Sequence, residues 1–256
     1  MKVLETKNVD KSYTNNKKTN LTTALNDVSL SIEDNEFVGI MGPSGSGKTT
    51  LLNVTSGIDN CKKGEINIWG NDICKMKKND LSLFRRKNIG MVFQDFNLLD
   101  SLSVKENIIL PLILDKKYEP MEGSEVDELA DMLDIKELMD RYPYEISGGQ
   151  QQRVAICRAI VNKPRIIFAD EPTGNLDSKT SKKVLSYFEL VRNQYNVSIL
   201  MVTHDPFSAS YCNRVVFLHD GSIIKEIRTN GDKNQFFNKI LEEIQSINAD
   251  NIENNH

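Results

Sequence analysis

Residues 37–50 read FVGIMGPSGSGKTT, an apolar run of five residues that leads directly into a glycine-rich loop. The apolar run predicts a buried strand, and residues 48–56 predict a helix that ends near Gly57. The loop between them, residues 42–49, fits the pattern G-x-x-x-x-G-K-[ST]. Glycines allow successive backbone N–H groups to point inward around a phosphate, and the start of a helix adds a favourable dipole. We therefore predict a phosphate-binding loop.

The residues of this loop have separate predicted roles. Lys48 would place its cation on the β- and γ-phosphates, and the Thr49 hydroxyl would bind Mg²⁺. The alternative is a chance glycine-rich turn followed by a lysine, and the flanking strand and helix argue against it. By itself the motif indicates only the broad class of P-loop NTPases. The predicted nucleotide-binding residues of the loop are Gly42, Pro43, Ser44, Gly45, Ser46, Gly47, Lys48, Thr49 and Thr50.

A second apolar run, residues 165–169, ends in the carboxylates of Asp170 and Glu171. Such a run is typical of a strand buried on both faces of a parallel sheet, where acids are costly without a cationic partner. Neighbouring strand residues point to opposite faces, so the two acids should differ in role. Asp170 would hold Mg²⁺ through its water shell, and Glu171 would polarise the water that attacks the γ-phosphate. The alternative is that both acids bond nearby cations or helix N-termini.

Two further polar residues follow predicted strands. Gln94 comes after residues 89–93, and His204 comes after residues 198–202. Ligands of open α/β sheets collect beyond the carboxyl ends of the strands, where the phosphate-binding loop and the two acids are also expected. Either residue alone is a weak signal, because a polar loop residue is usually only solvated. Their shared placement makes them candidates for sensing the γ-phosphate.

The rest of the chain alternates between strand and helix patterns, which predicts a mainly parallel sheet. The predicted strands are residues 4–13, 25–32, 37–41, 64–69, 89–93, 165–169, 198–202, 214–218 and 222–227. The predicted helices are residues 48–56, 104–110, 124–133, 147–161 and 178–195, followed by an amphipathic tail helix near Phe236 that docks on the domain or on a partner. We also expect Trp69 in the core, a polar loop at residues 15–20 and disorder at residues 250–256.

Composition limits the possible classes of protein. The 256 residues are 39% hydrophobic, enough for one domain with an inserted subdomain. The longest apolar candidate for a membrane span, residues 108–114, is short and contains Pro111. The net charge of −4 and the scattered basic stretches argue against nucleic acid as a partner. The four cysteines form no C-x-x-C pair, so we expect reduced thiols and no cysteine-bound metal.

Residues 146–153, ISGGQQQR, precede a predicted helix and narrow the class further. Ser147 and Gln150 have the spacing of a capping box, which explains both residues without any ligand. A capping box does not explain Gly148 and Gly149, since each glycine weakens a helix by about 1 kcal/mol relative to alanine. Bare backbone at a helix N-terminus would suit a second phosphate site.

With this stretch, residues 4–227 resemble the ABC (ATP-binding cassette) ATPases. Their signature L-S-G-G-Q has Ile146 here in place of the leading leucine. The other motifs of the family occur in the family's order. They are Tyr13 as the aromatic that stacks on adenine, the loop at residues 42–49, Gln94, Ser147, Gly148, Gly149, Gln150, Asp170, Glu171, the Asn175-Leu176-Asp177 segment and His204.

The resemblance implies a P-loop NTPase fold of the ABC type, with a parallel core sheet, an antiparallel β-subdomain and an inserted α-helical subdomain. Residues 1–94 and 164–230 would form the catalytic core with the β-subdomain, residues 95–163 the helical subdomain, and residues 231–256 a C-terminal helix and tail. ATP and Mg²⁺ are the implied cofactors.

The resemblance also implies a head-to-tail homodimer with two ATP–Mg²⁺ sandwiched between the copies. The loop of one copy would face residues 147–150 of the other, with Asn175 and Asp177 in the interface. Glu171 and His204 would serve the attack by water. Gln94, as a further Mg²⁺ ligand, would link the site to a transmembrane permease that holds the protein at the inner face of the cell membrane.

Within the family, residues 168–177 resemble the branch that serves lipoprotein-extraction, macrolide-efflux and cell-division complexes. Residues 95–112 and 203–212 are similar to the ATPases of bacitracin-type antimicrobial-peptide resistance transporters, whose permease often works with a sensor histidine kinase. An ATPase that powers removal of such peptides is therefore the first hypothesis. A signalling module that acts through a membrane partner is the second. A soluble cassette acting on DNA or ribosomes, and a kinase or GTPase, are disfavoured.

Overall fold

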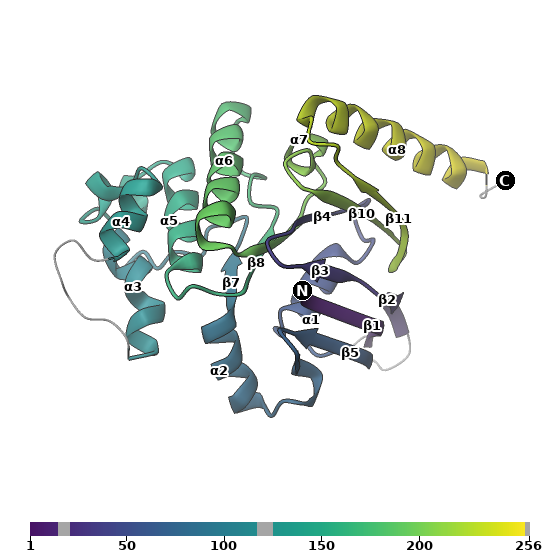
Figure 1. Cartoon of the computed structure of the whole chain (residues 1–256), viewed down its shortest axis with the longest axis horizontal. Helices are drawn as coiled ribbons and strands as arrows, with labels where there is room; N and C mark the ends of the chain where they lie inside the picture. The colour runs from purple at the N-terminus through teal and green to yellow at the C-terminus, as the bar shows by residue number, and fades with distance from the viewer. Residues whose placement is uncertain (15–20, 117–124, 254–256) are drawn as a thin grey trace.

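The computed structural model describes residues 1–14, 21–116 and 125–253, and its core is a six-stranded sheet (Figure 1). The strand order is β11-β10-β4-β9-β8-β7. Strands β10, β4, β9, β8 and β7 pair in parallel, and β11 joins the edge antiparallel. The predicted mainly parallel sheet is therefore confirmed. The strands are β4 Phe37–Met41, β7 Ile89–Val92, β8 Ile166–Asp170, β9 Ser198–Val202, β10 Arg214–His219 and β11 Ser222–Arg228.

A second, antiparallel sheet is built around the long strand β1 (Lys2–Thr14). The prediction of a single strand over residues 25–32 was wrong, because the chain leaves one strand after Val28 and begins another at Ser31. The two pieces pair with different parts of β1, and Thr6 bridges the break by hydrogen bonds to the backbone of Val28 and Leu30. The other strands of this sheet are β2 Leu21–Val28, β3 Ser31–Glu33, β5 Lys63–Ile68 and β6 Asn71–Asp72.

The helices pack on the core sheet or gather beside it. Three of them, α3 to α5, lie between β7 and β8 in the sequence and stand together on the side opposite the antiparallel sheet (Figure 1). The helices are α1 Lys48–Thr55, α2 Lys78–Asn88, α3 Val104–Leu114, α4 Glu125–Met132, α5 Gly148–Ile160, α6 Ser178–Tyr195, α7 Pro206–Ala209 and α8 Lys233–Glu253. Short 3₁₀ turns occupy Ile73–Lys75, Lys136–Leu138 and Pro143–Glu145.

Sequence analysis missed α2 and misjudged the end of the chain. None of the eleven residues of α2 is fully buried, and its Leu81 and Phe84 are only partly buried against the core, so the apolar stripe is too narrow to detect. Trp69 packs against the core as expected but is only partly buried, and the guanidinium carbon of Arg165 lies 4.2 Å from its ring centroid. Disorder from residue 250 was wrong, because α8 continues to Glu253. Three predictions fall wholly or partly outside the described residues. They are the polar loop at residues 15–20, the first residue of the helix predicted at 124–133, and the tail at residues 254–256.

Strand β4 separates two hydrophobic clusters, which is why its sequence is apolar without alternation. All five of its residues are buried. Phe37 and Met41 face the cluster that includes α3, α5, α6 and the start of α8. Val38 and Ile40 face the cluster shared with α1 and the antiparallel sheet. The strand that carries the phosphate-binding loop is thus held from both sides.

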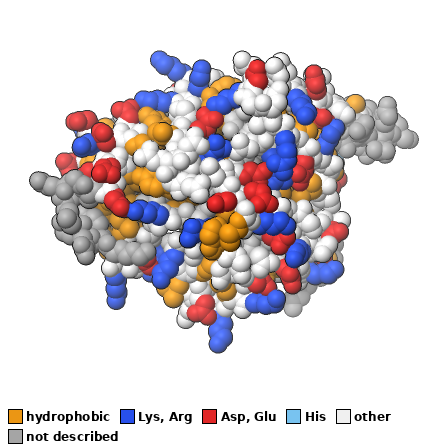
Figure 2. All heavy atoms as spheres, in the orientation of Figure 1, with side chains coloured by type: hydrophobic (Ala, Val, Ile, Leu, Met, Phe, Trp, Pro, Cys, Tyr) orange, Lys and Arg blue, Asp and Glu red, His pale blue; other side chains and the backbone are white. Residues whose placement is uncertain are grey.

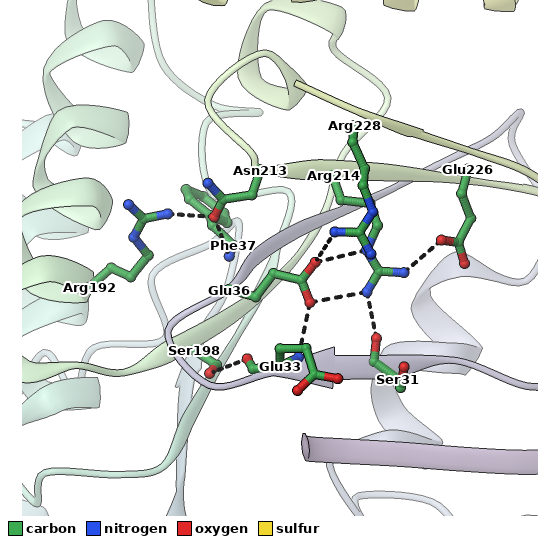
Figure 3. A network of polar contacts seen from close by, with 10 residues as sticks. All are labelled: Ser31, Glu33, Glu36, Phe37, Arg192, Ser198, Asn213, Arg214, Glu226 and Arg228. Carbon is green, nitrogen blue, oxygen red and sulfur yellow. Dashed lines mark hydrogen bonds and ion pairs between the residues drawn. The ribbon is translucent and has the colours of Figure 1, made fainter. Parts of the chain in front are cut away.

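A buried ionic network fixes the other end of β4 (Figure 3). Glu36, next to the first residue of the strand, lies 2.9 Å from Arg214 Nε and 3.2 Å from Arg228 Nη1. Arg214 is 3% exposed and also pairs with Glu226 at 2.8 Å. Burial by itself would raise the pKa of Glu36, but the hydrogen bond from Arg214 holds that pKa below its ordinary value. The network ties β3 and β4 to β10 and β11.

The tail helix α8 packs on the domain, which is one of the two predicted arrangements. Phe236 and Ile240 are fully or almost fully buried, and ion pairs join Lys225 to Glu243 and Lys233 to Glu189. Elsewhere the surface is mixed, with lysine and arginine side chains interspersed among aspartate and glutamate on the face shown in Figure 2. No helix in the described ranges combines the length and the apolar character needed to cross a membrane.

Candidate functional site

The predicted convergence at one edge of the core sheet is confirmed. The phosphate-binding loop follows β4, His204 follows β9, and Asp170 and Glu171 lie at the end of β8. Because β4, β9 and β8 pair in parallel and in this order, their carboxyl ends meet at one edge. The sheet thus brings the loop next to Asp170, Glu171 and His204, each of which lies more than 100 residues from it in the sequence.

The loop between β4 and α1 leaves no room for a side chain at Gly47. Gly47 stands directly before α1 with φ +101°, a conformation that favours glycine. A Cβ atom there would lie 2.3 Å from the carbonyl oxygen of Ala24. Within the described chain, no side chain caps the first turn of α1. Its N–H groups are therefore free to bind an anion.

Lys48 and Ser46 have buried polar groups inside this loop. The Lys48 ammonium donates hydrogen bonds to the carbonyl oxygens of Gly42 (2.8 Å) and Pro43 (2.9 Å). Burial lowers the pKa of Lys48, and the negative charges of Glu171 and Asp170 oppose that shift. The Ser46 hydroxyl oxygen is buried and has no hydrogen-bond partner among the described residues. Both groups fit a phosphate that would supply oxygen acceptors.

Asp170 carries the strongest sign of a cation site. Its Oδ1 atom is buried without a hydrogen-bond partner in the described chain, and the Thr49 hydroxyl acts to lower its pKa. Burial raises the pKa of Asp170, and the charge of Glu171 adds to that effect. No three His, Cys, Asp or Glu side chains gather as a metal site in the described ranges. The residues therefore fit Mg²⁺, which commonly takes one or two protein ligands together with water and phosphate oxygens.

Glu171 and His204 form the one close acid–imidazole contact of the site. His204 Nδ1 lies 2.6 Å from Glu171 Oε2, with the glutamate side chain 23% exposed and the histidine 67% exposed. Glu171 has φ +45°, which is uncommon for a residue with a side chain, and its N–H donates to the carbonyl oxygen of Val202 on β9. This backbone bond fixes the carboxylate at the sheet edge. The pair suits a carboxylate base oriented by an imidazole.

One pocket of about 850 Å³ joins Lys48, Glu171 and His204 to Tyr13, and neither Ser46 nor Asp170 lines it. Tyr13 is 43% exposed at the end of β1, with its hydroxyl bonded to Asp59 at 2.9 Å. Sequence analysis missed five lining residues, because apolar side chains carry no motif. The pocket is lined by Tyr13, Ala24, Met41, Gly42, Pro43, Ser44, Gly45, Gly47, Lys48, Thr49, Thr50, Glu171, His204, Phe217, Ile244 and Ile247.

Gln94 lies outside this pocket. Its amide nitrogen donates to Asn175 Oδ1 at 3.1 Å, and Asn175 Nδ2 donates back to the Gln94 carbonyl and to Asp95 Oδ1. The contact joins the segment after β7 to the segment before α6. The role of Gln94 as an Mg²⁺ ligand thus stays a prediction, and it would require the side chain to leave Asn175.

The ISGGQ stretch also lies outside the pocket. Ser147 and Gln150 form the expected capping box at the start of α5, with Ser147 N–H donating to Gln150 Oε1 at 2.8 Å. Gly149 has a packing reason for its missing side chain, since a Cβ atom there would lie 2.3 Å from Thr180 Cγ2 on α6. Asp177 caps α6 through the N–H groups of Lys179 and Thr180.

Comparison with known proteins matches this chain to the ABC transporter family model over residues 25–174. The chain is 49% identical to the ABC transporter ATP-binding protein YvcR of Bacillus subtilis over 98% of this chain and 96% of that one. It is 44% identical to the bacitracin export ATP-binding protein BceA of Halalkalibacterium halodurans over the whole of both.

Among solved structures, the dimeric post-hydrolysis state of the ATP-binding cassette MJ0796, bound to ADP and Pi, superposes with a TM-score of 0.78. The match has 38% sequence identity and covers 90% of this chain and 100% of that one. Both the nucleotide pocket and the resemblance to bacitracin-type ATPases agree with these comparisons. The chain belongs to the ABC transporter family and is one of its ATP-hydrolysing, ATP-binding proteins.

Proposed function

We propose that this chain powers a membrane permease that exports antimicrobial peptides or removes them from their targets. The observation that carries the proposal is the 44% identity to BceA, which is named for bacitracin export and matches over the full length of both chains. The match includes α8, whose Ile244 and Ile247 line the pocket. The peptide itself would bind the permease, so its identity is outside this chain.

The residues of the pocket support a stepwise role for each group. The N–H groups at the start of α1 and the Lys48 ammonium would bind the phosphates, with Lys48 exchanging its two carbonyl partners for phosphate oxygens. Thr49 and Asp170 would hold Mg²⁺, which neutralises charge on the phosphates when bound. Glu171 would accept a proton from the attacking water, and His204 would keep the carboxylate oriented.

The working unit in this proposal is a head-to-tail homodimer. The start of α5 is outside the pocket of its own chain, and its N–H groups are the type of surface that binds the far side of a phosphate. The related cassette MJ0796 is dimeric in its ADP- and Pi-bound structure. Nucleotide held between two copies would drive closure, and hydrolysis would permit opening. Residues 95–163 would move as a unit, and Gln94 would pass that movement to the permease.

The test is protection against bacitracin in a sensitive bacterial strain. The chain is produced together with a multi-spanning permease of the bacitracin-transporter type as its candidate partner, either unchanged or as Glu171→Gln. The proposal expects a rise in the inhibitory concentration of at least about fourfold for the unchanged pair and none for Glu171→Gln, because turnover is required. Equal protection by both variants, or a reporter response to the peptide without protection, would favour signalling through the membrane partner instead.

A further inference from the structure

The four cysteines of the chain occupy two different environments. Cys157 and Cys212 are buried in the core, and burial raises the pKa of both thiols. Cys61 is partly exposed and Cys74 is exposed. These two are separated by 13 positions in the sequence, yet their Sγ atoms lie 3.0 Å apart. Spacing in the sequence gave no hint of this pair, because strand β5 folds between its members.

The pair sits where two loops of the antiparallel sheet meet. Cys61 lies in the segment between α1 and β5, and Cys74 lies in the 3₁₀ turn Ile73–Lys75, which is capped by Asp72. A cavity of about 60 Å³ borders both sulfurs and is otherwise lined mainly by apolar residues. A cavity needs only about 10–15 Å³ to hold a water molecule. A molecule slightly larger than water, such as hydrogen peroxide, therefore has room beside the thiols.

The loop that carries Cys61 also contacts Tyr13, the aromatic residue of the nucleotide pocket. Asp59 accepts a hydrogen bond from the Tyr13 hydroxyl at 2.9 Å and pairs with Lys11 at 2.7 Å. Lys11 also donates to the Asn60 carbonyl at 2.7 Å. Only Asn60 thus separates Cys61 from Asp59, whose carboxylate accepts the hydrogen bond from Tyr13.

We propose that Cys61 and Cys74 are a peroxide-sensitive thiol pair whose disulfide weakens the hold of Asp59 on Tyr13 and so lowers the affinity for ATP. Hydrogen peroxide oxidises one thiol to a sulfenic acid and releases water. The second thiol attacks that sulfur, forms the S–S bond and releases a second water, so two thiols and one peroxide give one disulfide and two waters. A small-molecule dithiol reverses the step by exchange. A disulfide is ~2.05 Å long, so the sulfurs must approach by about 1 Å, enough to disturb a hydrogen bond.

The first test maps the thiols of the purified full chain after treatment with hydrogen peroxide. Free thiols counted in denaturant should fall from four to two, and a peptide that joins Cys61 to Cys74 should appear by mass spectrometry. Dithiothreitol should restore all four. The variants Cys61→Ser and Cys74→Ser should keep three free thiols under the same mild treatment, with alanine replacing serine if either serine variant is unstable. Four unreacted thiols, or oxidation without this cross-link, would overturn the proposal.

The second test measures steady-state ATP hydrolysis of the same samples. In the oxidised wild type we expect KM for ATP to rise roughly two- to tenfold with kcat within about a factor of two, because aromatic stacking on a base contributes mainly to binding. The Cys61→Ser/Cys74→Ser double variant should show the same KM before and after peroxide. An oxidised, cross-linked wild type with unchanged KM would overturn the link to Tyr13. Since thiol mapping does not use ATP, failure of the cross-link is distinguishable from failure of the proposed function.

Discussion

The N-termini of α1 and α5 are both rich in glycine, but only the α5 terminus is capped by side chains. At α1, Gly47 adopts φ +101° and no side chain in the described chain caps the helix. At α5, Ser147 and Gln150 close a capping box over the first turn. Gly149 is small because Thr180 packs against it. The α1 terminus therefore offers open N–H groups to a ligand, whereas at the α5 terminus the Gln150 N–H is already bonded to Ser147 of the same chain.

The two termini also differ in their position relative to the pocket. The α1 terminus lines the 850 Å³ pocket together with Glu171 and His204, and the start of α5 does not. Within one chain, the α1 terminus can hold a nucleotide in this pocket. The α5 terminus lies outside the pocket and would need the nucleotide of another copy. In the proposed head-to-tail dimer, the α1 side would carry the catalytic chemistry and the α5 side would serve another copy.

The largest expected effect tests whether the α1 side carries the chemistry. Glu171→Gln should reduce kcat by roughly 10²–10⁴-fold, the usual contribution of a general base, because the amide cannot accept the proton of water. Binding of ATP should change little, since Lys48 and the loop remain. Steady-state phosphate release measures the first effect and equilibrium titration with a fluorescent ATP analogue measures the second. Turnover within threefold of wild type would contradict the assigned base.

A matched pair of glycine substitutions sharpens the comparison through stability. Gly47→Ala should cost about 2–5 kcal/mol of unfolding free energy, since it combines backbone strain with a clash against the Ala24 carbonyl. Gly149→Ala should cost only about 1–2 kcal/mol, because overpacking against Thr180 is partly offset by the better helix propensity of alanine. Urea denaturation measures both changes.

Rescue separates the two glycines further. Adding Thr180→Ser removes the Cγ2 atom that the Gly149→Ala methyl would meet, so the double variant should recover most of the lost stability. The Gly47→Ala clash is with backbone, and Thr180→Ser should leave it unchanged. If Gly149→Ala proved as harmful as Gly47→Ala, with no rescue, the packing explanation for the α5 glycine would be wrong.

The smallest expected effect concerns the cation side of the α1 pocket. Burial raises the pKa of Asp170 in the folded chain, so the folded state binds a proton more tightly than the unfolded state does. The stability of the nucleotide-free chain should therefore fall as pH rises from the ordinary aspartate pKa of 3.8 through the higher folded value. Asp170→Asn lacks this titration and should unfold at a higher temperature than wild type at neutral pH, with the difference shrinking in acid. A lower midpoint for Asp170→Asn at neutral pH would contradict it.

The parts of this molecule that follow local rules could be predicted from sequence. The strand Phe37–Met41 and the helix Ser178–Tyr195 occur where apolar periodicity places them. The break between β2 and β3 could not be predicted, because it depends on Thr6, more than 20 residues away. Helix α2 was missed for a different reason, because none of its residues is fully buried and its apolar stripe is narrow.

The site shows the same division between local and long-range information. Motifs identified the polar groups around the phosphate-binding loop, because those groups are fixed by chemistry. They did not identify Ile244, which α8 carries to the pocket from the far end of the chain. They also suggested a phosphate role for Gly149, for which the packing against Thr180 gives a sufficient structural reason. Contacts between distant segments are set by tertiary packing, and a single sequence does not record them.

The most direct test mixes two inactive variants, Lys48→Ala and Ser147→Arg, and measures ATP hydrolysis. If each site combines the loop of one copy with the α5 terminus of the other, a mixed dimer has both defects in one site and leaves the second site intact. We predict recovery of roughly a quarter of wild-type activity in an equal mixture, since about half of the dimers are mixed and each has one good site. The control mixes the Lys48→Ala/Ser147→Arg double variant equally with wild type. Each site of its mixed dimers carries one defect, so only the wild-type dimers, about a quarter of all dimers, stay active, whereas sites formed within one chain would keep about half of the activity. A mixture that stays inactive, although mixed dimers form, would contradict the shared site.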